Sequence, residues 1–170
     1  MIQTPDTNPL PEPDVRSEAH RLVQQLEQIQ GKKALVLVVN SDSRQRDYLS
    51  NLFRDKGQEK GLGLVVSAKE NPHDVINLYK AFREVDSLGN PNNIVLVVTR
   101  VLTPTPGVSV NIAQEIDTIS KGQGWDMPLI VSSSTQDMWN MQMQKQFPNR
   151  FVGVYRNDSG PVLDALQTRL

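Results

Sequence analysis

The stretch ALVLVVNSDSRQRDYLSNLF, from Ala34 to Phe53, decides the fold of this 170-residue chain. Its first six residues, 34–39, are all apolar, which is typical of a strand buried on both faces of a parallel sheet. The polar triplet Asn40-Ser41-Asp42 ends the run, and apolar side chains then recur at helical spacing over 48–53. Asp42 is the expected N-cap of that helix. A buried strand followed directly by a helix is the opening unit of an α/β sheet.

The same alternation continues through the rest of the sequence. Short apolar runs at 34–39, 63–68, 93–99, 128–134 and 151–155 are separated by segments of helical periodicity. This order predicts a single α/β domain with a parallel sheet covered by helices on both faces. Ligands of such sheets bind beyond the carboxyl ends of the strands. The polar residues at those ends are Asn40, Ser41, Asp42, Ser67, Thr99, Arg100, Ser132, Ser133, Ser134, Tyr155 and Arg156.

The N-terminal part of the chain divides into two segments before the domain at 32–170. Residues 1–13 hold four prolines and few apolar side chains, so a flexible leader is expected. Residues 14–31 are predicted to be a helix with Asp14 as its N-cap. Its apolar residues recur at spacings of 4, 3, 4 and 3, and they are Val15, Ala19, Leu22, Leu26 and Ile29. Two interpretations stay open: the stripe packs on the chain's own domain, or residues 15–29 pair with a second copy.

Composition excludes several classes of function. The chain has no cysteine, which removes disulfides, thiolate metal sites and a cysteine nucleophile. A net charge of −1 and the lack of a basic run with aromatics argue against nucleic acid as a partner. No apolar run reaches the length of a membrane span, so a cytoplasmic protein is expected. His20 and His73 have no metal-ligand spacing and are expected to be solvated, and neither a metal nor a cofactor is expected.

Taken in order, the strand and helix segments of residues 33–170 resemble a response-regulator receiver domain, a fold of flavodoxin-like topology. In that family an acidic pair ends the first strand, and an Arg and a Leu follow at fixed offsets. Asn40-Ser41 hold the places of the acids here, with Arg46 and Leu49 at the offsets. The resemblance also covers the third strand with its Pro-containing loop, the strand ending in Ser132-Ser133, and the last strand and helix. It implies a three-layer, doubly wound sheet of five parallel strands in the order 2-1-3-4-5.

The departures from the receiver pattern fall on the phosphorylation chemistry. Phosphoryl transfer to an aspartate needs that aspartate, carboxylates that hold Mg²⁺, and a cation. The acceptor position falls on Thr99 or Arg100, and neither is a carboxylate. The basic residue of the last strand is Tyr155 or Arg156 rather than Lys. The resemblance therefore indicates a degenerate pseudo-receiver without an enzymatic activity.

A pseudo-receiver is expected to bind a protein partner in a signalling or regulatory assembly. Receiver domains commonly use the face made by the fourth helix, fifth strand and fifth helix of the domain, and the same face could pair two copies of the protein.

An enzymatic alternative stays open. Residues 93–116, followed by MPLIV, also resemble the central part of a Toll/interleukin-receptor-like domain. Ser109 and Glu115 have that family's spacing of six residues. In its enzymatic members the glutamate drives cleavage of the nicotinamide–ribose bond of NAD-type nucleotides. Glu115 is then the catalytic candidate, whereas a surface glutamate on a helix is the simpler interpretation.

Overall fold

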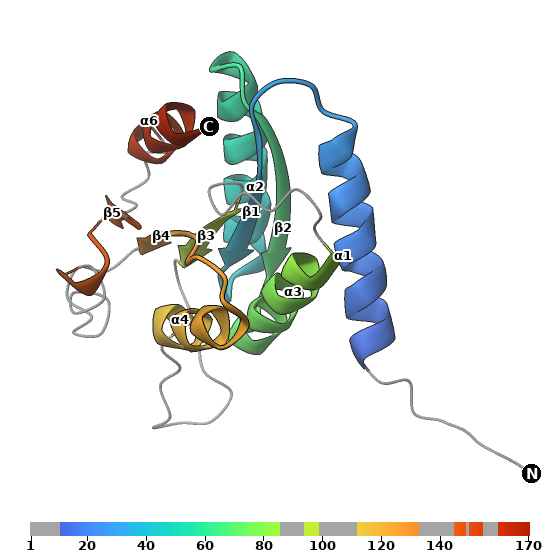
Figure 1. Ribbon diagram of the computed structural model, residues 1–170. Helices are drawn as coiled ribbons and strands as arrows, with labels where there is room; N and C mark the ends of the chain where they lie inside the picture. The colour runs from blue at the N-terminus through green and yellow to red at the C-terminus, as the bar shows by residue number, and fades with distance from the viewer. Residues whose placement is uncertain (1–10, 86–93, 99–111, 133–144, 149, 155–159) are drawn as a thin grey trace, which may run out of the picture.

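The computed structural model describes residues 11–85, 94–98, 112–132, 145–148, 150–154 and 160–170 (Figure 1). Helices and strands alternate over most of these residues. They are α1 (Pro11–Glu27), β1 (Lys33–Val39), α2 (Ser43–Glu59), β2 (Gly63–Lys69), α3 (Pro72–Val85), β3 (Ile94–Val98), α4 (Ile112–Gln123), β4 (Leu129–Ser132), β5 (Phe151–Val154) and α6 (Gly160–Arg169). No helix among these residues is long and apolar enough to span a bilayer.

The strands form one sheet with β1 inside it. β1 pairs in parallel with β2 on one side and with β3 on the other, so that Leu35 lies opposite both Val65 and Ile94. β3 continues to β4 and β4 to β5, again in parallel, which gives the order β2-β1-β3-β4-β5. The β4–β5 register shifts between Ile130 and Val131. The prediction of an α/β fold with a parallel sheet flanked by helices is confirmed.

Alternate residues of β1 enter two different apolar cores, because side chains of a strand point to opposite faces in turn. Leu35, Leu37 and Val39 pack with residues of α1, α3 and α4. Ala34, Val36 and Val38 pack with residues of α2 and α6 on the other face. Each of the six side chains is at most 1% exposed. Burial on both faces explains why this run contains no polar residue.

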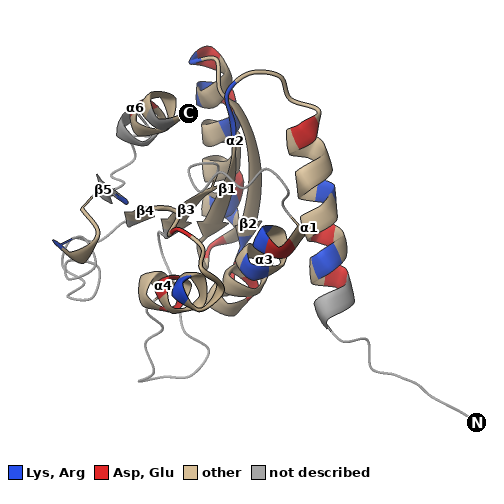
Figure 2. Ribbon diagram, in the orientation of Figure 1, with Lys and Arg blue, Asp and Glu red and all other residues tan. Residues whose placement is uncertain are grey.

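Helix α1 begins earlier than expected. It starts at Pro11, so Asp14 lies inside the helix and the prediction that Asp14 is the N-cap was wrong. Pro11 and Pro13 are compatible with this start, since the first turn of a helix has no intrahelical acceptor for its backbone N–H groups. Residues 1–10 of the expected leader lie outside the described residues. The helix ends at Glu27, and acidic and basic side chains alternate along it (Figure 2).

The apolar stripe of α1 is covered by the protein's own domain. Ala19, Leu22 and Leu26 are at most 3% exposed and belong to the same core as α3, which lies beside α1 in Figure 1. The first of the two interpretations of the stripe, packing within one molecule, is the one observed. A second copy could use this stripe only by displacing α1.

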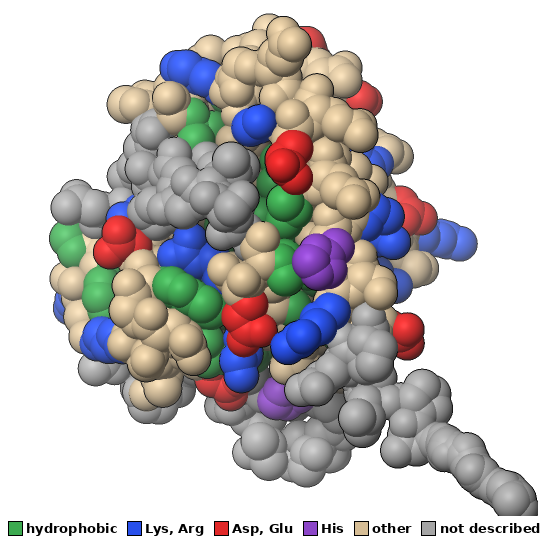
Figure 3. All heavy atoms as spheres, turned by 45° about the vertical axis from the view of Figure 1, so that its right-hand side comes forward, with side chains coloured by type: hydrophobic (Ala, Val, Ile, Leu, Met, Phe, Trp, Pro, Cys, Tyr) green, Lys and Arg blue, Asp and Glu red, His purple; other side chains and the backbone are tan. Residues whose placement is uncertain are grey.

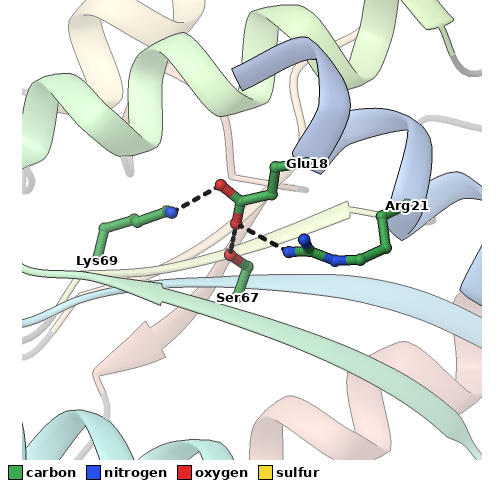
Figure 4. Close-up of polar contacts among 4 residues, drawn as sticks. All are labelled: Glu18, Arg21, Ser67 and Lys69. Atoms are coloured by element: carbon green, nitrogen blue, oxygen red, sulfur yellow. Dashed lines mark hydrogen bonds and ion pairs between the residues drawn. The ribbon is translucent and has the colours of Figure 1, made fainter. Parts of the chain in front are cut away.

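A polar cluster ties α1 to the edge strand β2 (Figure 4). Glu18 of α1 accepts a hydrogen bond from Ser67 Oγ at 2.9 Å and pairs with Lys69 Nζ at 2.7 Å. Arg21 lies 3.9 Å from the same carboxylate. The carboxylate thus bridges two residues on one face of β2, which sets the position of α1 along the strand.

Gly63 marks a close approach between the two segments. A Cβ built at this first residue of β2 would collide with the side chain of Ile29, two residues beyond the end of α1. Glycine therefore allows the segment leaving α1 to lie directly on the start of β2.

Helix α3 is joined to α4 by a buried hydrogen bond. The Tyr79 hydroxyl lies 2.7 Å from Ser120 Oγ, which itself donates to the carbonyl of Ile116 at 2.6 Å. Burial of the phenol raises the pKa of Tyr79 above its ordinary value of 10.0, because the charged phenolate would lose its solvation.

Because α1 packs on the core, shortening one of its buried side chains is expected to lower the free energy of unfolding strongly. Leu26→Ala is expected to lower the free energy of unfolding by about 2–5 kcal/mol, since it removes a fully buried side chain and leaves a cavity. The matched change Gln25→Ala, at an exposed position of the same turn, should alter it by less than about 0.5 kcal/mol. Urea unfolding followed by circular dichroism measures both. Equal effects of the two variants would show that α1 is not docked in solution.

The raised pKa of Tyr79 predicts a loss of stability at high pH. Above about pH 10 the unfolded protein releases this proton while the folded protein retains it, so the free energy of unfolding falls as pH rises toward the folded-state pKa. Tyr79→Phe should reduce this fall between about pH 9 and 11. Tyr48→Phe is the control, because Tyr48 is 49% exposed. Urea unfolding across this pH range measures the effect. The prediction fails if the free energy of unfolding of both variants falls with pH as steeply as that of the wild type.

Candidate functional site

Asn40 is the first residue after β1 and is only 2% exposed. Its Oδ1 accepts a hydrogen bond from the backbone N–H of Asp42 at 2.8 Å. Its own backbone N–H donates to the carbonyl of Lys69 at 3.1 Å, at the end of the neighbouring strand β2. The Asn40 amide thus closes an Asx-type turn that redirects the backbone from β1 into α2. Asn40 is a structural amide at the position where a receiver domain has an acid.

Asp42 caps α2, as predicted. Its backbone is extended, with φ −100° and ψ 121°, and its Oδ1 accepts a hydrogen bond from the N–H of Arg44 at 2.9 Å. Its carbonyl accepts the N–H of Arg46 at 3.0 Å, which starts the helical ladder. The one carboxylate of the triplet is therefore engaged by the helix N-terminus. Ser41, between the two, is half-buried.

Arg46 brings a positive charge to the same turn. Its Nη1 donates to the carbonyl of Asn40 at 2.8 Å, and its carbonyl accepts the hydroxyl of Ser50 at 2.7 Å. A divalent cation would need negative oxygens at this edge, whereas the described residues place an amide, a capping carboxylate and a guanidinium there. Among these residues no cluster of three or more His, Cys, Asp or Glu side chains could hold a metal ion. The described residues of this turn do not supply the ligand set of a Mg²⁺ site.

The remaining strand-end candidates are only partly placed. Ser132 ends β4 and is paired in register with Val98, the last residue of β3, and Val98 is in turn paired with Val39. The backbone of Ser132 therefore lies at the same edge of the sheet as Asn40. Ser67, near the end of β2, is bonded to Glu18. The other strand-end residues of the predicted pocket lie outside the described residues: Thr99, Arg100, Ser133, Ser134, Tyr155 and Arg156.

Glu115, the alternative catalytic residue, lies in the first turn of α4 and is half-buried. It lines an open hollow of about 260 Å³ together with Gln114, Thr118 and Ile119. The lining residues that the structure describes all come from one helix, so no described residue forms an opposing wall against which a dinucleotide could be buried. Ser109 lies outside the described residues. The geometry around Glu115 fits the simpler interpretation of a helix-surface glutamate.

The two histidines are exposed, as expected. His20 lies on α1 and His73 on α3, and Figure 3 shows both on one face of the molecule with charged side chains near them.

Sequence reasoning missed a cluster at the opposite edge of the sheet. The Arg83 guanidinium lies 5.9 Å from the ring centroid of Tyr79 and 5.5 Å from that of Trp125, and it donates to the carbonyl of Asp126 at 2.9 Å. The two rings meet edge to face, 6.2 Å apart at 88°. The members of this cluster lie on α3 and on the segment before β4, so no local pattern could have joined them.

Comparison of the sequence and fold with protein-family models, with curated proteins and with solved structures finds no significant match in any of the three.

The capping role of Asp42 predicts that two substitutions at this position will change the free energy of unfolding by different amounts. Asp42→Ala should lower the free energy of unfolding by about 0.5–2 kcal/mol, since the N–H of Arg44 loses its acceptor. Asp42→Asn should stay within about 0.5 kcal/mol of wild type, because asparagine is an equally good N-cap. Thermal and urea unfolding of the two variants are the measurement. If Asn costs as much as Ala, the negative charge has a role other than capping.

Proposed function

We propose that this protein is a pseudo-receiver: a receiver-like domain without a phosphorylation site that acts as a protein-interaction module in a signalling or regulatory assembly. One observation carries the proposal. The residue that follows β1, where the resemblance expects a metal-binding acid, is the buried amide Asn40, and its oxygen is already engaged by the Asp42 N–H.

The arrangement of elements supports the receiver-like part of this proposal. Strand β1 lies inside the sheet, β2 lies at one edge, and the order β2-β1-β3-β4-β5 corresponds to the 2-1-3-4-5 order of flavodoxin-like sheets. α2 and α6 share one core while α3 and α4 share the other. We assign this arrangement to the three-layer, doubly wound receiver fold, with α1 as an addition beside α3.

The contacts of the turn after β1 support the proposal that the phosphorylation site is lost. Moving a phosphoryl group onto a side chain requires oxygen ligands for Mg²⁺ and an acceptor carboxylate. Asn40 is neutral, Asp42 caps a helix, and Arg46 adds positive charge on the carbonyl of Asn40. In sequence the acceptor position holds Thr99 or Arg100. A domain that keeps the scaffold without these ligands is suited to recognition by other proteins.

The proposed contact face consists of the fourth helix of the domain, expected within residues 135–147 and mostly outside the described residues, together with β5 and α6. The orientation of α6 is held by polar contacts with the residue that follows α2. Lys60 Nζ pairs with Asp164 at 2.7 Å, and Gln167 Nε2 donates to the carbonyl of Lys60 at 2.7 Å. Leu163 and Leu166 anchor the helix in the core. A helix fixed in this way is a favourable platform for a partner, because little ordering is needed on binding.

The loss of phosphorylation is tested with acetyl phosphate. The full-length protein, incubated with acetyl phosphate and Mg²⁺, is expected to keep its unmodified intact mass, since the turn after β1 offers no ligand set for the metal. A stable adduct of one phosphate that disappears in Asp42→Asn would overturn the proposal. Because asparagine keeps the helix cap, loss of the adduct in that variant could not be ascribed to unfolding.

The choice between a binding module and an enzyme is tested on the same material. Incubation with NAD⁺ and chromatography of the products are expected to show no cleavage. Turnover that vanishes in Glu115→Gln would replace the proposal with a Toll-like activity.

Partner capture should use the full-length protein beside a version lacking residues 1–10. Removing residues 1–30 would uncover the core against which α1 packs. A module that acts through the α6 face is expected to retain the same specific protein in both forms. A failure of the full-length protein to retain any specific protein would count against the proposal.

A further inference from the structure

We propose that Arg83, held between Tyr79 and Trp125, is an anchor for a carboxylate group of a protein partner. The inference rests on the proposed function as an interaction module and names the chemistry of one partner contact. The Arg83 site lies at the edge of the sheet where the strands begin, whereas the Asn40 turn lies at the edge where they end.

The guanidinium is fixed in place before any partner arrives. Arg83 lies in the last turn of α3, and its charged group lies 5.9 Å and 5.5 Å from the two ring centroids. Its Nη2 donates to the backbone carbonyl of Asp126 at 2.9 Å. The Tyr79 ring is itself anchored through its hydroxyl to Ser120. A guanidinium that is already oriented loses little conformational freedom when it forms a further hydrogen bond.

The charge of Arg83 lacks a counter-charge among the described residues. Arg83 is half-buried and pairs with no described acid. A partly desolvated cation next to aromatic rings gains strongly from a charge-assisted hydrogen bond. A carboxylate supplies both the negative charge and the acceptors.

A carboxylate fits this site better than a phosphate. Sites for phosphate dianions commonly combine several cations or a row of backbone N–H groups. Lys121 of α4 is engaged, since it pairs with Asp117 at 3.1 Å and lies over the ring of Phe147. One guanidinium between two rings therefore matches a single negative charge. Arginine, tyrosine and tryptophan are also the residues that most often dominate protein interfaces.

The Arg83 cluster lies at the opposite edge of the sheet from the turn after β1, so a partner could contact Arg83 without touching that turn. α3 runs back along the sheet after β2, and Trp125 and Asp126 come just before β4, so the cluster lies at the edge where the strands begin. Asn40 lies where β1 ends. A partner that places an aspartate, a glutamate or a free C-terminal carboxylate on Arg83 would therefore approach from the opposite edge.

The probe for the test is an acetylated, amidated tetraglutamate peptide, with tetraglutamine as its neutral match. The full-length protein is titrated while the indole N–H signal of Trp125 is followed by NMR, assigned by comparison with Trp139→Phe. We expect a saturable shift with tetraglutamate, none with tetraglutamine, and roughly tenfold weaker binding at high salt because the contact is a charge pair.

Variants distinguish the anchor from a general attraction of acids to the surface. Arg83→Met keeps the apolar stem and should weaken tetraglutamate binding roughly tenfold or more, since the charge-assisted hydrogen bond is lost. Arg54→Met, at an exposed position of α2, should leave it unchanged. If Arg83→Met does not fold, Arg83→Lys takes its place and should still bind more weakly than wild type, because lysine lacks the planar fork.

Three results would each overturn the anchor. They are equal binding by wild type and the Arg83 variant, no shift with tetraglutamate, and a saturable shift with inorganic phosphate alone. None of these outcomes affects the acetyl phosphate result, so failure of the anchor and failure of the pseudo-receiver proposal remain distinguishable.

Discussion

The burial of β1 on both faces is the constraint on which the rest of the structure depends. Residues 34–39 send alternate side chains into two cores, one shared with α1, α3 and α4 and the other with α2 and α6. A polar group anywhere in this run would lose its solvation with no acceptor to replace it. Polar chemistry can therefore begin only where the strand ends, which is why Asn40 is the first polar residue and why the turn after it must satisfy its own hydrogen bonds.

That turn uses its polar groups internally. The Asn40 oxygen binds the N–H of Asp42, the Asp42 carboxylate binds the N–H of Arg44, and Arg46 binds the carbonyl of Asn40. The Asn40 oxygen and the Asp42 carboxylate are thus engaged in starting α2, and Arg46 adds a positive charge that would repel a metal ion. In the receiver pattern the acids stand at the positions of Asn40 and Ser41, and here the first of these positions holds an amide whose oxygen is used by the turn. The proposal of a pseudo-receiver rests on this internal use of the turn's polar groups together with the missing acids.

Local patterns in the sequence were sufficient to predict the helices and strands, but they could not predict the contacts between them. The apolar runs located the strands, and Asp42 was predicted as a cap because capping depends on residues two positions apart. The start of α1 was missed since prolines suggest a leader, although the first helical turn accepts them. The stripe of α1 could not be assigned to a partner, because its pattern is the same whether it covers α3 or a second copy. The pairs Glu18–Lys69 and Arg83–Trp125 bring together residues from separate elements, and only the fold determines them.

The two edges of the sheet differ in how far the charges of their described residues are compensated, and this difference bears on how the proposed interaction module could be selective. In the described part of the carboxyl edge, Asp42 and Arg46 are hydrogen-bonded to backbone groups of the turn, so a partner has little to gain from these two residues. At the amino edge, Arg83 keeps a charge that no described acid balances, next to rings that exclude water. Binding energy is largest where a partner relieves an existing deficit. Under the proposed function, a scaffold whose strand-end turn is internally satisfied would therefore recognise other proteins through the edge where the strands begin.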